Sequence, residues 1–173
     1  MAFSRSKTKT SEDSETILAY RLVAPKWAAS ALSGEGARLN GGRWNSPGMP
    51  MVYLSGSRAL AALELLVHLT TPETRLIPRV LITVAIPRAL IGGRFWTTPG
   101  WQEEPPGKNS TDQGDDWLRT ASTAGVRAPS VLVPEEDNIL LNPSHPDFSR
   151  INVLESREFS YDPRFARISS ALS

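Results

Sequence analysis

The sequence predicts a single α+β domain in which short strands are more numerous than helices. The chain has 173 residues, which is close to the usual size of one domain. Its 14 prolines and 12 glycines indicate short elements joined by many turns. Residues 1–15 are polar and are predicted to be a flexible tail, so the folded domain is expected to span residues 16–173.

The N-terminal half is predicted to contain two strands and a helix, followed by a third strand. The apolar runs at residues 17–23 and 51–54 have the β-branched and aromatic content of strands. Between them, residues 33–48 carry five glycines and are expected to form a loop. Residues 57–69 predict a helix with the first serine as its N-cap, and residues 80–86 predict a strand buried on both faces.

The C-terminal half is predicted to begin with a long loop at residues 97–115, whose length suggests a lid or binding segment. A short helix is expected to begin at Asp115 or Asp116 and to end at Gly125. Three further strands are predicted, at residues 130–133, 138–142 and 151–161, and the first two are expected to form a hairpin.

The overall charge and composition exclude several classes of function. Lys and Arg number 19 against 18 Asp and Glu, so the net charge of +1 disfavours nucleic-acid binding by this chain alone. The absence of cysteine excludes disulfides, thiolate catalysis and cysteine-based metal sites, and it fits a reducing compartment. No apolar run is long enough for a secretory signal or a membrane span, so a cytoplasmic location away from membranes is expected.

Common catalytic and nucleotide-binding motifs are also missing. The glycines of residues 33–48 do not form a G-x-G-x-x-G turn between a strand and a helix, and there is no P-loop. Ser130 is not in a G-x-S-x-G motif. The two histidines, His68 and His145, are isolated, so neither a serine hydrolase nor a metal site is expected.

Glu64 is the first candidate for chemistry, because it is the only acid in the otherwise apolar helix at residues 57–69. At helical spacing it shares or borders the face formed by Leu60 and Val67, which is expected to pack on the core. Burying an ionised carboxylate is costly unless it is paired, so an arginine or a ligand is expected beside it. A purely structural Glu–Arg pair remains the alternative.

Two arginines and a tryptophan are the next candidates. Arg21 lies inside an apolar strand and Arg43 lies in the glycine-rich segment, where a planar guanidinium group can bind a carboxylate or phosphate through two hydrogen bonds. The alternatives are a solvent-facing strand side chain for Arg21 and an ordinary loop charge for Arg43. Trp44 adjoins Arg43 and is a candidate stacking surface for a base or a nicotinamide ring, although core filling explains most tryptophans.

An ordered series of segments resembles the RES domain, the toxin of RES/Xre toxin-antitoxin systems. The similarity covers roughly residues 15–165. The segments that carry it are Tyr20-Arg21-Leu22, residues 33–48, Val52-Tyr53, residues 59–69, residues 129–134 and residues 138–143.

The resemblance implies a fold similar to that of ADP-ribosyltransferase toxins, with two small, mostly antiparallel β-sheets flanked by helices and NAD⁺ in the cleft between them. It places catalytic roles on Glu64, Arg21 and Arg43. The implied NAD⁺-binding residues are Tyr20, Arg21, Arg43, Tyr53, Glu64, Ser130 and Asn142. Asn142 is equally well explained as a residue that closes a turn before Pro143.

The resemblance also implies a reaction, cleavage of the bond between nicotinamide and ribose. Inorganic phosphate is the expected acceptor, giving nicotinamide and ADP-ribose 1″-phosphate, while a protein or water as acceptor remains open. Glu64 would stabilise the oxocarbenium-like transition state and the arginines would bind phosphate groups. Ser130 would hydrogen-bond ribose or phosphate, and Tyr53 would orient the nicotinamide-ribose end. NAD⁺ is then a substrate, and neither a resident cofactor nor a metal is expected.

The expected partner is a cognate Xre-family helix-turn-helix antitoxin that covers the entrance of the site, as the resemblance implies. The near-neutral charge of this chain agrees with an arrangement in which the partner makes the DNA contacts. A catalytically inactive module that only binds the antitoxin is the alternative from a different functional class.

Overall fold

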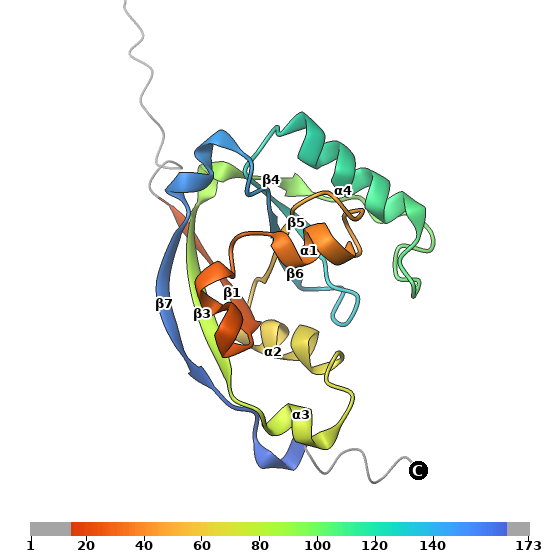
Figure 1. The fold of residues 1–173 in the computed structure, drawn as a ribbon. Helices are drawn as coiled ribbons and strands as arrows, with labels where there is room; N and C mark the ends of the chain where they lie inside the picture. Colours follow the sequence, from red (N-terminus) through yellow and green to blue (C-terminus); the bar gives the residue numbers. More distant parts are fainter. Residues whose placement is uncertain (1–14, 166–173) are drawn as a thin grey trace, which may run out of the picture.

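The computed structural model describes residues 15–165, and the chain forms an α+β fold built on one seven-stranded sheet (Figure 1). Apart from Glu15, the predicted N-terminal tail lies outside the described residues, as do residues 166–173 of the expected domain. The strands are β1 (Thr16–Val23), β2 (Val52–Ser55), β3 (Arg79–Pro87), β4 (Ile91–Arg94), β5 (Gly125–Pro129), β6 (Asp137–Leu141) and β7 (Asn152–Phe159). Within residues 15–165, no helix is long and apolar enough to span a membrane.

The sheet has the order β4-β5-β6-β2-β1-β3-β7, and only the β4–β5 pair is parallel among these strands. β1 pairs with β3 along its whole length, but it pairs with β2 at a single position, Tyr20 opposite Ser55. The structure therefore has one sheet where the resemblance implies two, and its halves, β4-β5-β6-β2 and β1-β3-β7, are joined by this single residue pair. One hydrogen-bonded junction at this point makes the ladder continuous while allowing the halves to diverge.

Four α-helices lie around this sheet: α1 (Glu35–Asn40), α2 (Arg58–Leu66), α3 (Pro72–Leu76) and α4 (Lys108–Thr120). Short 3₁₀ segments lie at Pro25–Ser30, Arg88–Leu90 and Pro146–Arg150, and a further 3₁₀ turn covers residues 163–165. Figure 1 shows α1 and α2 on the inner side of the curved strands β3 and β7, with α4 at the opposite side of the view.

The predicted helix that carries Glu64 is confirmed as α2. Ser57 is its N-cap, since its Oγ accepts a hydrogen bond from the Leu60 amide at 3.1 Å. Leu60 and Ala61 are buried, and Ala61 packs in a small cluster with Tyr20 and Leu22 of β1. This apolar contact fixes α2 on β1, beside the narrow junction of the sheet.

Several element boundaries differ from the predictions for local reasons. α4 begins at Lys108, well before the expected start, and Asp115 lies within the helix rather than at its N-cap. Its N-cap residue is Gly107, which offers no side-chain cap, and a further glycine inside the helix lowers its helical propensity. The helix α1 was not predicted because it lies within the glycine-rich segment.

The strand predicted at residues 130–133 is wrong, because β5 ends at Pro129 and a turn begins at Ser130. The Ser130 Oγ accepts hydrogen bonds from the amides of Leu132 and Val133, which closes the backbone locally instead of extending it. The expected hairpin therefore joins β5 to β6, and the strand predicted at residues 138–142 is confirmed as β6. The remaining predicted strands are confirmed as β1, β2, β3 and β7.

Candidate functional site

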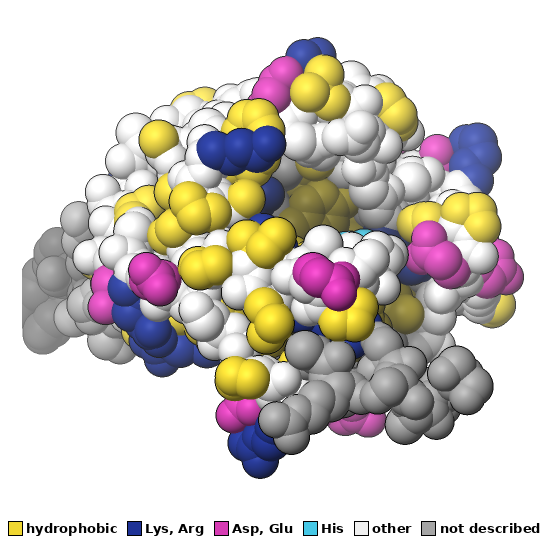
Figure 2. All heavy atoms as spheres, turned by 60° about the horizontal axis from the view of Figure 1, so that its bottom comes forward, with side chains coloured by type: hydrophobic (Ala, Val, Ile, Leu, Met, Phe, Trp, Pro, Cys, Tyr) yellow, Lys and Arg dark blue, Asp and Glu magenta, His cyan; other side chains and the backbone are white. Residues whose placement is uncertain are grey.

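A cavity of about 1120 Å³ lies at the narrow junction between the two halves of the sheet. Its walls come from β1, β2, β6, α2, the glycine-rich segment and the turn after β5, and Glu104 and Pro106 also line it. Figure 2 shows the molecule hollowed on one face, with hydrophobic and basic side chains around the hollow. This volume slightly exceeds the roughly 300–1,000 Å³ range of small-molecule sites, so the cavity has room for an extended ligand.

Glu64 lines this cavity from α2, and its carboxylate is held by two neutral donors. Its Oε1 accepts hydrogen bonds from Ser130 Oγ at 2.8 Å and from Asn138 Nδ2 at 2.7 Å. The expected arginine partner is not found, since within residues 15–165 Glu64 forms no ion pair. The described residues also give its Oε2 no hydrogen bond, so this oxygen keeps its capacity to bind a ligand.

Ser130 is fully buried and does not line the cavity. Its hydroxyl donates to Glu64 and accepts from two backbone amides of its own turn. Because its single proton is used by Glu64, the expected contact of Ser130 with ribose or phosphate does not fit this geometry. The structure brings Ser130 to the site through Glu64 instead.

Arg21 lines the cavity from β1 and has no acidic partner in the described part of the chain. Its NH1 donates to the Ala31 carbonyl at 2.9 Å. Burial lowers the pKa of its guanidinium group, which is the sign of a cation without a compensating charge. An anionic ligand in the cavity would supply that charge, so Arg21 fits the predicted binding role.

Arg43 also lines the cavity, but its guanidinium group is occupied by the chain itself. Its NH1 donates to the carbonyls of Trp101 and Glu103 at 2.8 and 2.9 Å, and its NH2 pairs with Glu104 Oε2 at 3.0 Å. Glu104 is 79% exposed and lines the cavity as well. An anionic ligand would reach Arg43 by displacing this exposed carboxylate.

The two predicted tyrosines lie in the cavity wall. The Tyr53 hydroxyl donates to Asn45 Oδ1 at 2.7 Å and accepts from the Trp44 amide at 3.0 Å. Burial raises the pKa of Tyr53, so its hydroxyl stays protonated and bound to the glycine-rich segment. The Tyr20 ring lies 4.5 Å from the Arg58 guanidinium group, in a cation–π contact. The hydroxyl of Tyr53 is therefore occupied by the chain itself, which leaves its ring to orient a ligand.

Two other predicted residues have structural contacts of their own. Trp44 borders the cavity, but it is only 2% exposed and its ring lies 5.1 Å from Phe95 in a buried aromatic cluster. Asn142 does not line the cavity. Its side chain donates to the Leu118 carbonyl and accepts from the Ser144 amide, so it closes the turn after β6. Neither stacking by Trp44 nor ligand binding by Asn142 is supported.

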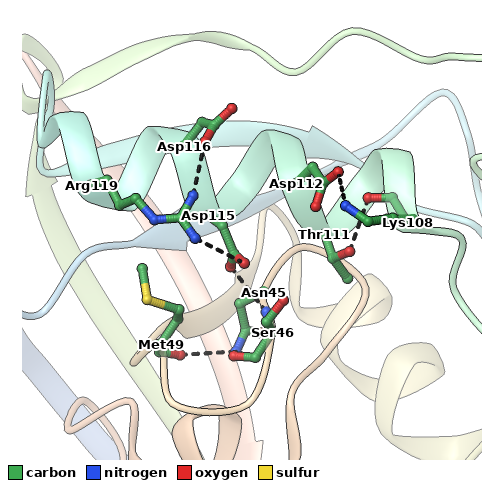
Figure 3. Close-up of polar contacts among 9 residues, drawn as sticks. All are labelled: Asn45, Ser46, Met49, Lys108, Thr111, Asp112, Asp115, Asp116 and Arg119. Carbon is green, nitrogen blue, oxygen red and sulfur yellow. Dashed lines mark hydrogen bonds and ion pairs between the residues drawn. The ribbon is translucent and has the colours of Figure 1, made fainter.

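The segment that carries Arg43 is fixed against α4 by buried polar contacts that the sequence did not predict (Figure 3). The Asn45 Nδ2 lies within hydrogen-bonding distance of three carbonyls, including that of Met49 at 2.9 Å, and its two N–H groups are shared among them. The Ser46 amide donates to Asp115 Oδ1 at 2.9 Å, and Arg119 lies 3.7 Å from the second oxygen of Asp115. Asp115 thus binds α4 to the loop.

Asn138 is the functional candidate that sequence reasoning missed. It lines the cavity from β6 and contacts Glu64 directly. Its position in the strand at residues 138–142 was visible, but the pairing that places it opposite Ser55 depends on strand register.

In residues 15–165, no three His, Cys, Asp or Glu side chains gather as in a metal site.

The model of the "RES domain" family matches residues 18–162 of this chain. The chain belongs to the RES-domain family. This RES domain is 42% identical over 149 residues to the "Prs ADP-ribosylating toxin" of Sphingobium sp. (strain YBL2), covering 83% of this chain and 92% of the relative. It is 37% identical over 152 residues to the "Toxin Res" of Yersinia enterocolitica, covering 86% and 99%.

A solved structure supports the fold of this RES domain independently. The chain is similar to one in the crystal structure of the M. tuberculosis MbcT-MbcA toxin-antitoxin complex, with a TM-score of 0.65. The match covers 89% of this chain and 88% of the other, at 20% sequence identity. At this identity the likeness shows the shared fold.

Proposed function

We propose that this RES domain is a toxin that cleaves the nicotinamide–ribose bond of NAD⁺ and transfers the ADP-ribosyl group to inorganic phosphate. The products are nicotinamide and ADP-ribose 1″-phosphate. The observation that carries the proposal is the arrangement of Glu64, whose Oε1 is held by two neutral donors in a cavity that also contains Arg21. The relatives named as toxins, one of them ADP-ribosylating, support a toxin that uses NAD⁺, whichever acceptor takes the ADP-ribosyl group.

The chemistry requires stabilisation of positive charge on ribose. The N-glycosidic bond breaks with its electron pair passing to the nicotinamide nitrogen, which becomes neutral, while a phosphate oxygen forms the new bond to ribose C1. A carboxylate next to the ribose stabilises the oxocarbenium-like transition state, and Glu64 Oε2 is the oxygen that is free for this. Arg21 binds the pyrophosphate or the attacking phosphate, because its charge has no other partner among the described residues.

A protein acceptor is the second candidate, and the name of the Sphingobium relative favours it. The proposed partner is a helix-turn-helix antitoxin of the Xre family, which agrees with a structural relative solved as a toxin-antitoxin complex. We place the reaction in the cytoplasm, where its proposed substrate and partner are found.

The first test incubates the purified chain with NAD⁺ in the presence and absence of phosphate and separates the products by chromatography. We expect nicotinamide and ADP-ribose 1″-phosphate only when phosphate is present. The Glu64→Gln variant should lower the rate by about 100-fold or more, since it removes the charge that acts in the transition state. Glu73→Gln, an exposed change on α3, is the matched control.

The alternatives give different products. Equal NAD⁺ consumption without phosphate, with free ADP-ribose as product, indicates a hydrolase. Radiolabel from NAD⁺ on a protein band in a cell extract indicates a protein ADP-ribosyltransferase. A folded chain that consumes no NAD⁺ under any of these conditions overturns the proposal and leaves the antitoxin-binding module.

A further inference from the structure

A chain of three polar side chains connects β2 and β6 to the Glu64 carboxylate. The Ser55 Oγ donates to Asn138 Oδ1 at 2.9 Å, and Asn138 Nδ2 donates to Glu64 Oε1 at 2.7 Å. Ser55 is 5% exposed, and Asn138 is half-buried in the cavity wall. Such partly buried polar groups are retained against a desolvation cost, which their mutual hydrogen bonds offset.

The direction of these hydrogen bonds is fixed by chemistry. A carboxylate only accepts, so the Asn138 amide must turn its NH₂ group towards Glu64. Its carbonyl oxygen then faces β2, where the antiparallel register places Ser55 directly opposite. Because the Ser55 hydroxyl donates to this oxygen, Ser55 stabilises the one amide orientation that holds Glu64.

We infer that Asn138, oriented by Ser55, is a positioning residue that fixes the Glu64 carboxylate so that Oε2 faces the reacting ribose. The inference rests on the proposed function. Ser130 and Asn138 reach the same oxygen from different elements, the turn after β5 and strand β6. One donor would let the carboxylate rotate about its last bond, whereas two donors hold its plane.

The neutral character of Asn138 also matters for this role. An arginine at the same place would hold the carboxylate equally well, but its charge would offset the negative charge that the transition state requires. An amide orients the carboxylate and leaves that charge available for the developing cation. This explains how the partly buried Glu64 functions without the arginine partner that its apolar sequence environment predicts.

The test compares kinetics of NAD⁺ cleavage for the intact chain and for Asn138→Leu, Asn138→Asp and Ser55→Ala. Asn138→Leu keeps the size of the side chain but removes the donor, so kcat and kcat/KM should fall together by about 100-fold while KM is unchanged. Ser55→Ala should lower kcat in the same manner but by a smaller factor. The thermal unfolding midpoint of each variant verifies folding.

The pH profile of Asn138→Asp is the readout that a merely structural role would not change. Two carboxyl groups at this distance share one proton, and the protonated Asp donates to Glu64 as the amide does. We expect near-normal kcat in the pH range where the pair holds one proton, and a progressive loss as pH rises and both groups ionise. Asn152→Asp, the same change on exposed β7, is the control and should keep the profile of the unmodified chain.

The other charged and titratable groups around the site are the same in the unmodified chain and in Asn138→Asp. They are Tyr20, Arg21, Arg43, Tyr53, His68 and Glu104 in the cavity wall, with Glu136 and Asp137 next to Asn138. Normal kcat in a folded Asn138→Leu variant, or an unchanged pH profile for Asn138→Asp, overturns the inference while NAD⁺ cleavage by the intact chain stands. Failure of the intact chain to cleave NAD⁺ overturns the proposed function instead.

Discussion

Arg21 and Glu64 line the same cavity, yet neither forms an ion pair within residues 15–165. Each forms hydrogen bonds with neutral groups only: Arg21 with a backbone carbonyl, and Glu64 with a hydroxyl and an amide. Charges that are partly removed from water without an opposite charge cost stability, and such groups cluster at functional sites. By contrast, both terminal nitrogens of Arg43 have partners within the described chain.

This contrast predicts opposite effects of two matched substitutions. Arg21→Met removes an uncompensated cation and keeps most of the apolar stem, so KM for NAD⁺ should rise by about tenfold or more while stability is kept or increased. Arg43→Met removes the donors that hold Trp101, Glu103 and Glu104, so it should lower stability. Steady-state kinetics and urea unfolding of both variants measure these effects. A loss of stability with unchanged KM for Arg21→Met would contradict the assigned role.

The contact between the glycine-rich segment and α4 decides where Arg43 lies. Asp115 accepts the Ser46 amide, and next to it Gly114 lies against the Trp44 carbonyl, which an added Cβ would overlap. The glycine that weakens α4 as a helix is therefore the residue that lets the loop approach it. Local propensity and tertiary packing conflict here, and packing prevails.

Gly114→Ala should lower the free energy of unfolding by about 1–3 kcal/mol, although alanine is the better helix former. The backbone of the loop would have to move, because the overlapping atom belongs to a carbonyl and not to a flexible side chain. Gly36→Ala in α1 is the control, since a Cβ there meets nothing within 4 Å, and it should raise stability by up to about 1 kcal/mol. Urea denaturation measures both, and equal effects would refute the packing argument.

At the scale of the whole molecule, the cavity exists because two half-sheets meet at one residue pair. The half formed by β1, β3 and β7 brings Arg21, whereas the other half brings Asn138 and the turn at Ser130. Helix α2 packs on β1 and carries Glu64 to the same place. Two tyrosine hydroxyls stabilise this assembly, Tyr53 on Asn45 and Tyr161 on the carbonyl of Ala62 in α2.

These tyrosines predict a loss of stability at alkaline pH. Burial raises the pKa of Tyr161 to about 12, and it raises that of Tyr53 as well, above an unfolded value of about 10. Above about pH 10 the unfolded chain therefore binds fewer protons than the folded chain, and the free energy of unfolding falls. Urea denaturation across this range should give a flatter profile for the Tyr53→Phe/Tyr161→Phe variant than for the unmodified chain. Parallel profiles would contradict the prediction.

The sequence by itself determined the features that depend on local pattern. Apolar runs placed most of the strands, and the cap at Ser57 with the apolar spacing placed α2. The lone acid in that helix marked Glu64, and a charge inside an apolar strand marked Arg21. These signals lie within a few residues of each other along the chain, where periodicity and capping chemistry act.

Only the tertiary structure decided which groups meet. Strand register placed Asn138 opposite Ser55. The turn after β5 placed the Ser130 hydroxyl against Glu64, although Ser130 does not line the cavity itself. Arg43 forms an ion pair with Glu104, and Glu64 accepts hydrogen bonds from two neutral donors in place of an arginine. The residues in these contacts are far apart in sequence, and their pairing depends on sheet register and close packing of the whole domain. A local pattern identifies a residue that needs a partner, whereas the tertiary structure determines which residue that partner is.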